Sequence, residues 1–313
     1  MESKSYEIHF APLQGYTDVA FRNAFETYFG GVDTYYTPFI RIEKGDFRKK
    51  DVREIAMEAN TVRKLVPQLL AGNRDEFCRL ADLLQAQGYR EADINLGCSF
   101  PPIAGKQRGS GMLPHPELVA EMLKAMLEYP ELRFSVKMRL GWEDPRECLE
   151  LIPILNDFPL QHLTIHARVG KQQYKGETQP EAFAAFYECY QRPLFYNGDL
   201  LTVEDIRKII QQFPNLKGVS LGRGLLSDPF LASEFKENMS KDSREKMEIC
   251  RNFHDHLLSN YATTLQGDSH LLMKMKTFWE YFLPETDRKL LKAIKKANKL
   301  QQYTDAVRKI WTI

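Results

Sequence analysis

Short apolar or β-branched segments recur along the first three quarters of the chain, and each is followed by Gly, Pro, Asn or Asp. This pattern is typical of buried strands that end in loops. We predict eight strands, at residues 9–13, 34–40, 64–70, 92–98, 134–140, 162–168, 193–198 and 218–224.

Between most of these segments, apolar residues recur at spacings of three and four, which predicts helices at residues 74–88, 115–129 and 202–213. Thr202, followed three residues later by Asp205, is an N-cap signal for the last of them. Eight strands alternating with helices predict a parallel sheet closed into a (β/α)8 TIM barrel. An open doubly wound sheet is the alternative, but residues 15–22 (GYTDVAFR) lack the GxGxxG turn that it favours.

After about residue 235 the strand pattern stops. Amphipathic helices are predicted at residues 243–264 and 269–282, and one or two more at residues 287–311. We therefore divide the chain into a barrel at residues 1–235 and an appended helical domain at residues 236–313.

The composition is that of a soluble globular protein, because 43% of the residues are hydrophobic and 27% are charged. The formal net charge is +1, so any nucleic acid must be bound through a local basic patch. The five cysteines are widely spaced and form no CxxC pair, which argues against a disulfide framework and a zinc site and fits a reducing compartment. No run of about 18 apolar residues is present. We expect a cytoplasmic monomer with no metal and no membrane span.

Polar residues and glycines gather at the carboxyl ends of the predicted strands, where barrel enzymes have their active sites. They are Gln14, Gln68, Asn95, Cys98, Lys137, Arg139, His166, Arg168, Asn197, Gly198, Asp199, Gly222, Arg223 and Gly224. Each alone has a structural explanation: a strand Gln satisfies a backbone group, a lone His is more often a core residue, and Asn-Gly-Asp is a common turn. Together at one end of a barrel they predict a site, because buried charges need a partner and an anionic ligand would supply one.

Two glycine-containing segments follow the last two strands, YNGDL (196–200) and LGRGLL (221–226). Barrels often hold a phosphate at this position. Glycines let backbone N–H groups approach an anion, and Arg223 adds positive charge. The pair predicts a phosphate site.

Several motifs resemble the tRNA-dihydrouridine synthase family, in the order in which that family has them. They are APLQGYTDVAFR (11–22), DINLGCSFPPIAGKQRGSGML (93–113), VKMRLGW (136–142), LTIHARVGKQQYKGE (163–177), YNGDL (196–200) and VSLGRGLLSDPFL (219–231). The usual Pro directly after the cysteine is Ser99 here, Leu13 replaces the family's Met, and Ala167 replaces a Gly. The resemblance covers nearly the whole predicted barrel, and the helix at residues 273–282 is similar to the family's C-terminal domain.

The resemblance implies an enzyme that binds FMN, uses NADPH or NADH, and reduces the C5–C6 bond of particular uridines in tRNA. Matched by position, the residues that hold FMN are Pro12, Leu13, Gln68, Lys137, His166, Asn197, Gly198, Asp199, Gly222 and Arg223. Asn95, Arg139 and Arg168 are placed near the uracil, and Cys98 aligns with the catalytic acid.

In this chemistry, reduced FMN gives a hydride to C6 of uracil, and Cys98 gives a proton to C5. A thiol with an ordinary pKa of about 8.5 is mostly protonated at neutral pH, so it can act as a general acid. Lys137 would offset negative charge on the reduced ring. A structural thiol at Cys98 and a Schiff-base Lys137 in an aldolase-type barrel are the alternatives.

Two basic clusters are candidates for phosphate contacts with tRNA. One is residues 41–53 (RIEKGDFRKKDVR), and the other is residues 286–313, with eight Lys or Arg against two Asp. In the second, Lys289, Lys292, Lys296 and Lys299 are predicted to share one helical face. The alternative functions are an FMN barrel oxidoreductase acting on a small molecule and a catalytically silent tRNA-binding protein.

Overall fold

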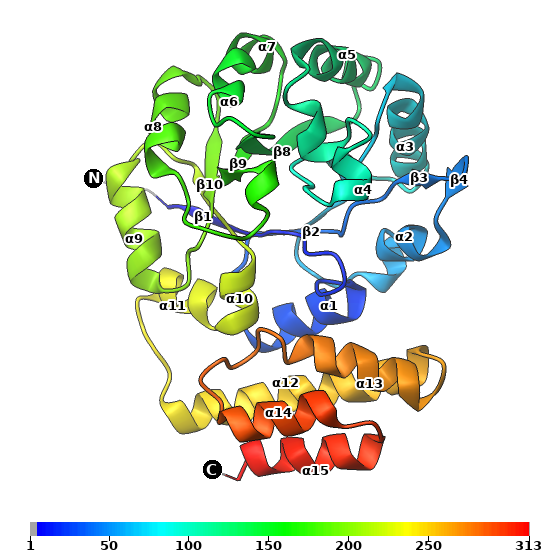
Figure 1. Ribbon diagram of the computed structural model, residues 1–313, viewed down its shortest axis with the longest axis vertical. Coiled ribbons are helices and arrows are strands. Elements are labelled where there is room, and N and C mark those ends of the chain that lie inside the picture. Colours follow the sequence, from blue (N-terminus) through cyan, green and yellow to red (C-terminus); the bar gives the residue numbers. More distant parts are fainter. Residues whose placement is uncertain (1–4, 313) are drawn as a thin grey trace.

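The computed structural model describes residues 5–312 of the chain. Its main sheet is a ring of parallel strands (Figure 1), in the order β5-β2-β1-β11-β10-β9-β8-β7-β6. The strands are β1 (Glu7–Phe10), β2 (Thr34–Tyr36), β5 (Leu65–Val66), β6 (Gln68–Leu69), β7 (Glu91–Leu96), β8 (Arg133–Gly141), β9 (Leu163–Val169), β10 (Leu194–Asn197) and β11 (Gly218–Leu221).

The short strands β5 and β6 are two parts of one strand, separated by Pro67, which has no N–H to donate. β5 pairs with β2 and β6 pairs with β7, so this interrupted strand joins the two ends of the sheet. The ring therefore has eight strand positions, each overlapping one of the eight predicted segments. The predicted barrel is confirmed.

Helices surround the ring, and most of them cover its outer face, whereas α4 lies inside the circle of helices, in the loop after β7 (Figure 1). They are α1 (Val19–Tyr28), α2 (Lys49–Glu54), α3 (Arg74–Ala86), α4 (Pro101–Ala104), α5 (Pro116–Met126), α6 (Glu147–Glu150), α7 (Ile152–Asp157), α8 (Pro180–Cys189), α9 (Val203–Gln212), α10 (Arg223–Ser227) and α11 (Leu231–Glu237). The predicted cap of α9 is confirmed: the Thr202 hydroxyl accepts from the Asp205 N–H at 3.1 Å, and the Asp205 carboxylate accepts from the Thr202 N–H at 2.9 Å.

A small hairpin, β3 (Ile42–Glu43) and β4 (Asp46–Phe47), was not predicted. Its two turn residues, Lys44 and Gly45, have φ values of +53° and +81°, as a two-residue hairpin turn requires. Arg79 of α3 fixes the hairpin, because it donates to the Gly45 carbonyl at 2.9 Å and lies over the Phe47 ring.

Four helices follow the barrel: α12 (Ser243–Thr264), α13 (Gly267–Phe278), α14 (Arg288–Lys296) and α15 (Leu300–Ile310). They pack together beside α1 (Figure 1), and one apolar core continues from the barrel into them. The predicted division at residue 235 lies within α11, and residues 1–4 and 313 of the two predicted domains lie outside the described residues. No helix among residues 5–312 is long and apolar enough to cross a membrane.

The predicted lysine face at residues 289–299 is wrong in part. α14 ends at Lys296, and both Ala297 and Lys299 have extended backbone before α15 begins at Leu300. Lys299 therefore does not continue the face of Lys289, Lys292 and Lys296. No Gly or Pro marks this break in the sequence.

The first loop of the barrel is held from both sides. On the helical side, Lys274 of α13 pairs with Asp18 at 2.6 Å and donates to the Gly15 carbonyl at 2.7 Å. Tyr261 of α12 also donates to Asp18, at 2.8 Å. This loop begins with Pro12 and Leu13, two predicted site residues. Helices α12 and α13 therefore help to fix the position of the predicted site.

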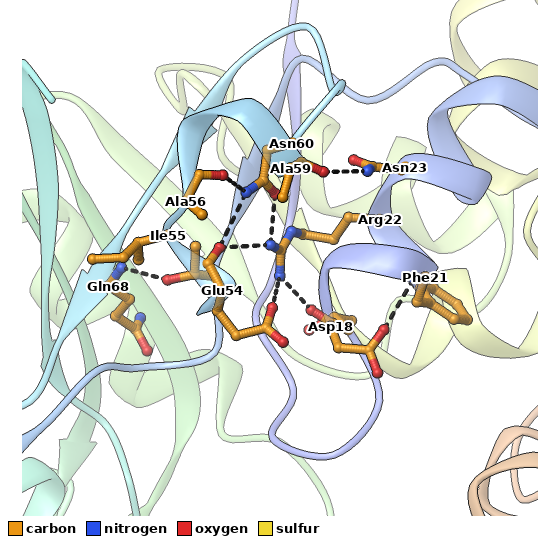
Figure 2. Close-up of polar contacts among 12 residues, drawn as sticks. Asp18, Phe21, Arg22, Asn23, Glu54, Ile55, Ala56, Ala59, Asn60 and Gln68 are labelled. Atoms are coloured by element: carbon orange, nitrogen blue, oxygen red, sulfur yellow. Dashed lines mark hydrogen bonds and ion pairs between the residues drawn. The ribbon is translucent and has the colours of Figure 1, made fainter. Parts of the chain in front are cut away.

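On the barrel side, the same loop is anchored by the buried Arg22 of α1 (Figure 2). Its guanidinium donates to the Thr17 carbonyl at 2.7 Å, to the Glu54 carboxylate at 2.9 Å and to the Asn60 side chain at 2.7 Å. A buried guanidinium is tolerated when it is paired and hydrogen-bonded in this way.

We expect Arg22→Met to lower the free energy of unfolding by about 3–5 kcal/mol, because Glu54 would lose its buried partner. Urea unfolding measures this change. Arg90→Met is the matched control, since the Arg90–Glu131 pair is exposed and such pairs contribute about 0–1 kcal/mol. Equal losses in the two variants would contradict the role given to Arg22.

Candidate functional site

Two adjoining pockets lie at the carboxyl ends of the strands. The first, here the anion pocket, has a volume of about 50 Å³ and contains nine of the predicted residues: Pro12, Leu13, Lys137, His166, Asn197, Gly198, Asp199, Gly222 and Arg223. The second, here the thiol pocket, has a volume of about 290 Å³ and contains Pro12, Leu13, Gln14, Gln68, Asn95, Cys98, Lys137, Arg139 and His166. Predicted residues from seven of the eight strand positions, or from the loops that follow them, thus converge on one site.

Lys137 of β8 lies where the two pockets meet. Its ammonium group donates to the Asn197 amide oxygen at 3.1 Å. Burial and the charge of Arg139 lower the pKa of Lys137 to about 8, against the attraction of Asp93. A half-buried cation with this little compensation is suited to an anionic ligand.

His166 of β9 lines both pockets beside Lys137. Burial and the charges of Arg139 and Lys137 hold the pKa of His166 well below its usual range, so the imidazole is neutral. Arg139 donates to the carbonyls of Gly97 and Val169, both at 3.0 Å, and its guanidinium is thereby fixed at the wall of the thiol pocket.

The far wall of the anion pocket combines glycines with an ion pair. Arg223 pairs with Asp199 at 2.6 Å. Gly198 has a φ of +151°, and a Cβ there would come within 2.8 Å of Thr178. Burial acts to raise the pKa of Asp199, but hydrogen bonding to Arg168 and the nearby positive charges outweigh it and lower that pKa.

Arg168 is placed differently from its prediction. It is 1% exposed and lines neither pocket, and its guanidinium pairs with Asp199 and donates to the Gly176 carbonyl at 2.7 Å. The geometry makes it a support for Asp199 behind the anion pocket. Contact with uracil stays a prediction for Asn95 and Arg139, which do line the thiol pocket.

Cys98 is held by a chain of hydrogen bonds that starts inside the barrel. Gln68 donates to the buried Asp93 at 2.7 Å, and Asn95 donates to Gln68 at 2.6 Å. The Asn95 amide oxygen then accepts from the N–H groups of Gly97 at 3.0 Å and Cys98 at 2.8 Å. Asn95 therefore orients the loop that carries the thiol.

The segment Gly109–Met112 packs against the other side of this loop. Ser110 donates from its N–H and its hydroxyl to the Cys98 carbonyl, at 3.0 and 2.9 Å. Gly109 has a φ of +56°, and a Cβ there would lie 2.7 Å from the Cys98 carbonyl oxygen. Burial raises the pKa of the Cys98 thiol, which keeps it protonated at neutral pH.

Three aromatic residues of the site were missed, of which Phe39 is a buried residue of the thiol pocket. Tyr174 lines both pockets, and its ring lies 4.6 Å from the Arg223 guanidinium carbon and 5.6 Å from that of Arg139. Phe100 lines the thiol pocket with 59% of its surface exposed. Tyr174 and Phe100 lie in loops that directly follow strands with predicted site residues. An aromatic residue at such a position was the sequence signal that could have identified them.

The donors of the anion pocket fit a phosphorylated cofactor. Arg223, Lys137 and the neutral His166 supply positive charge and N–H donors to this pocket. Within the described part of the chain, no group of three or more His, Cys, Asp or Glu residues is arranged to hold a metal ion.

A cation-lined pocket beside a thiol, at the carboxyl end of an eight-stranded barrel, defines a barrel enzyme that takes an anionic ligand. The sequence profile of the family described as "Dihydrouridine synthase (Dus)" matches residues 9–310. The chain belongs to the dihydrouridine synthase family, and it is an oxidoreductase of that flavin-dependent family.

Individual relatives agree with this assignment. The tRNA-dihydrouridine synthase B of Pasteurella multocida is 29% identical over 243 residues, which cover 75% of this chain and 70% of that protein. The tRNA-dihydrouridine(16) synthase of Aquipseudomonas alcaligenes is 28% identical over 260 residues, covering 77% of this chain and 78% of that protein. The resemblance in sequence motifs is thereby confirmed.

Solved structures show the same fold at low sequence identity. Morphinone reductase has a TM-score of 0.54 at 11% identity, covering 77% of this chain and 88% of that chain. The old yellow enzyme homologue from Zymomonas mobilis has a TM-score of 0.52 at 12% identity, covering 78% and 92%. These similarities concern the barrel fold alone.

We expect Gly109→Ala to be destabilising and to displace the Cys98 loop. Both Gly109→Ala and Gly30→Ala place a side chain at a positive φ, but only Gly109→Ala also creates a clash with Cys98. The loss of unfolding free energy in Gly109→Ala therefore exceeds that in Gly30→Ala by about 1–3 kcal/mol. Gly30 is a matched control because its φ is +62° and a Cβ there meets nothing within 4 Å. Alkylation of Cys98 by iodoacetamide, followed by peptide mass, is expected to become faster in Gly109→Ala only. Equal stability and equal alkylation in the two variants would contradict the packing role.

Proposed function

We propose that this enzyme is an FMN-dependent tRNA-dihydrouridine synthase, which reduces the C5–C6 bond of specific uridines in tRNA with NADPH or NADH as reductant. The single observation that carries the proposal is the arrangement of the two pockets. A protonated thiol, Cys98, lines a pocket that shares Lys137 and His166 with the neighbouring anion pocket.

Pro12, Leu13, Gln68, Lys137, His166 and Asn197 would hold FMN, with Gly198, Gly222 and Arg223 around its phosphate. Asp199 acts through its ion pairs, because it fixes Arg223 at one side and Arg168 at the other. When bound, FMN supplies the hydride for C6 of the uracil. Lys137, protonated below its pKa of about 8, stabilises negative charge next to it.

Cys98 holds the proton that the reaction delivers to C5 of the uracil. Its thiol stays protonated because burial raises its pKa, and its loop is fixed by Asn95 and Ser110. A general acid of this kind works when it is held within reach of the carbon that takes the proton. Asn95 and Arg139, at the wall of the same pocket, would orient the base.

A uridine in folded tRNA reaches this pocket only after it leaves its stack, so the enzyme must bind the surrounding phosphates. Arg41, Lys44 and Arg48, from the hairpin of residues 41–48, would serve on the barrel side. Lys289, Lys292 and Lys296 of α14 would serve on the helical side.

We expect Cys98→Ala to lower the rate of tRNA uridine reduction by about 10²–10⁴-fold, the usual contribution of a positioned general acid. The assay incubates unmodified tRNA with protein, FMN and NADPH, and measures dihydrouridine in the digested RNA by mass spectrometry. Cys189→Ala, at an exposed cysteine away from the pockets, is the matched control and is expected to keep the parent rate.

Two results would count against the proposal in different ways. A Cys98→Ala variant that reduces tRNA at the parent rate would refute the role of Cys98. A parent protein that oxidises NADPH with a small activated alkene but leaves every tRNA unchanged would refute tRNA as the substrate.

A further inference from the structure

A second concave surface adjoins the thiol pocket, and of its residues only Arg41 and Lys44 were given a role in the proposed function, as phosphate contacts. It has a volume of about 600 Å³, within the range of clefts that hold ligands. Its walls are the β3–β4 hairpin, the first turns of α3 and the loop after Cys98. We call it the basic groove, after the five cations that line it: Arg41, Lys44, Arg79, Lys106 and Arg108.

The cations of the basic groove differ in how far they are already neutralised. Arg41 pairs with Glu43 at 2.7 Å, and Arg108 pairs with Glu76 at 2.6 Å. Asp75 also lines the groove. Lys44 and Lys106 are exposed, and neither forms an ion pair with any residue of the described chain, so both are available to a ligand.

Phe100 lies between the basic groove and the thiol pocket and lines both. The prolines that follow it restrict its backbone to extended conformations, and its φ and ψ are −66° and 121°. Its carbonyl accepts from the N–H groups of Ile103 at 2.8 Å and Ala104 at 2.9 Å. The backbone is therefore fixed, while 59% of the residue's surface remains exposed.

An exposed aromatic ring next to free cations is the combination with which proteins bind single nucleic-acid strands, through base stacking and phosphate contacts. The ring also stands at the mouth of the pocket that contains Cys98. A strand whose uridine enters that pocket must continue outward, and the basic groove is continuous with the pocket at Phe100.

We propose that the basic groove binds the single tRNA strand flanking the target uridine, with Phe100 stacking on a neighbouring base and Lys44 and Lys106 contacting its phosphates. This inference rests on the proposed function and names the part of the substrate that this surface recognises. Ser99–Phe100–Pro101–Pro102, the segment that departs from the family's usual motif, thereby becomes a substrate-binding element.

The test measures binding of fluorescently labelled, unmodified tRNA transcripts by anisotropy over a series of salt concentrations. Lys44→Ala/Lys106→Ala is expected to reduce the slope of log affinity against log salt by about 1.4, since each contact with a single strand contributes about 0.7. Phe100→Ala is expected to weaken binding by about 5- to 150-fold, and Phe100→Trp to restore most of it.

Matched controls come from exposed residues far from the site. Lys124→Ala/Lys208→Ala removes two exposed lysines of α5 and α9, and Leu127→Ala removes an apolar side chain that is 56% exposed. Both are expected to leave slope and affinity unchanged. Circular dichroism and thermal unfolding confirm that each variant is folded.

The outcomes separate the inference from the proposed function. If the parent protein reduces the transcripts but Lys44→Ala/Lys106→Ala keeps the parent's salt slope and Phe100→Ala keeps its affinity, the basic groove does not bind the strand. If the parent neither binds nor reduces any transcript, the proposed function fails, and the inference fails with it.

Discussion

Uncompensated positive charge at the mouth of the barrel is the constraint on which the rest of the site depends. Lys137 and Arg139 are successive positions on the same face of β8; Lys137 is half-buried and Arg139 is buried. Lys137 donates to a neutral amide and has Asp93 as its acidic neighbour, while burial raises the pKa of Asp93 itself to about 6. A half-buried cation with so little compensation costs stability unless a ligand brings negative charge. In the proposed function, the phosphate and ring of bound FMN would provide that negative charge.

The same interior links the cofactor side of the site to the thiol side. Asp93, Gln68 and Asn95 form one hydrogen-bonded chain that ends at the backbone of Cys98. Gln68 and Lys137 both interact with Asp93, so the position of the acid and the charge of the lysine depend on one buried carboxylate. The helical region completes the frame from outside, since Lys274 and Tyr261 hold the loop that carries Pro12 and Leu13. Three residues that line neither pocket, Asp93, Lys274 and Tyr261, thus help to position residues that do.

Much of this could be predicted from the sequence, because strands buried on both faces are continuous apolar runs and parallel strands gather their carboxyl ends at one edge. The polar residues that end these runs, such as Asn95 and Lys137, were found for that reason. The hairpin at residues 42–47 was missed because its strands have two residues each and Lys44 is an unusual residue at positive φ. The break after Lys296 was missed because no Gly or Pro marks it in the sequence; Ile294 and Tyr303, on its two sides, are both buried in the core. The pairing of Arg168 with Asp199 was not predicted, because the sequence pattern does not show in which direction a side chain at the end of a strand points.

The visible absorption spectrum of the purified protein, titrated with FMN at pH 7 and again at pH 9, tests the central claim most directly. We predict that the protein is yellow or becomes so with one equivalent of FMN. We also predict weaker binding at pH 9, because Lys137 loses its proton as the pH rises through its pKa of about 8. Lys137→Met is expected to bind more weakly and without this pH dependence. A colourless protein that takes up no FMN at either pH would contradict the account.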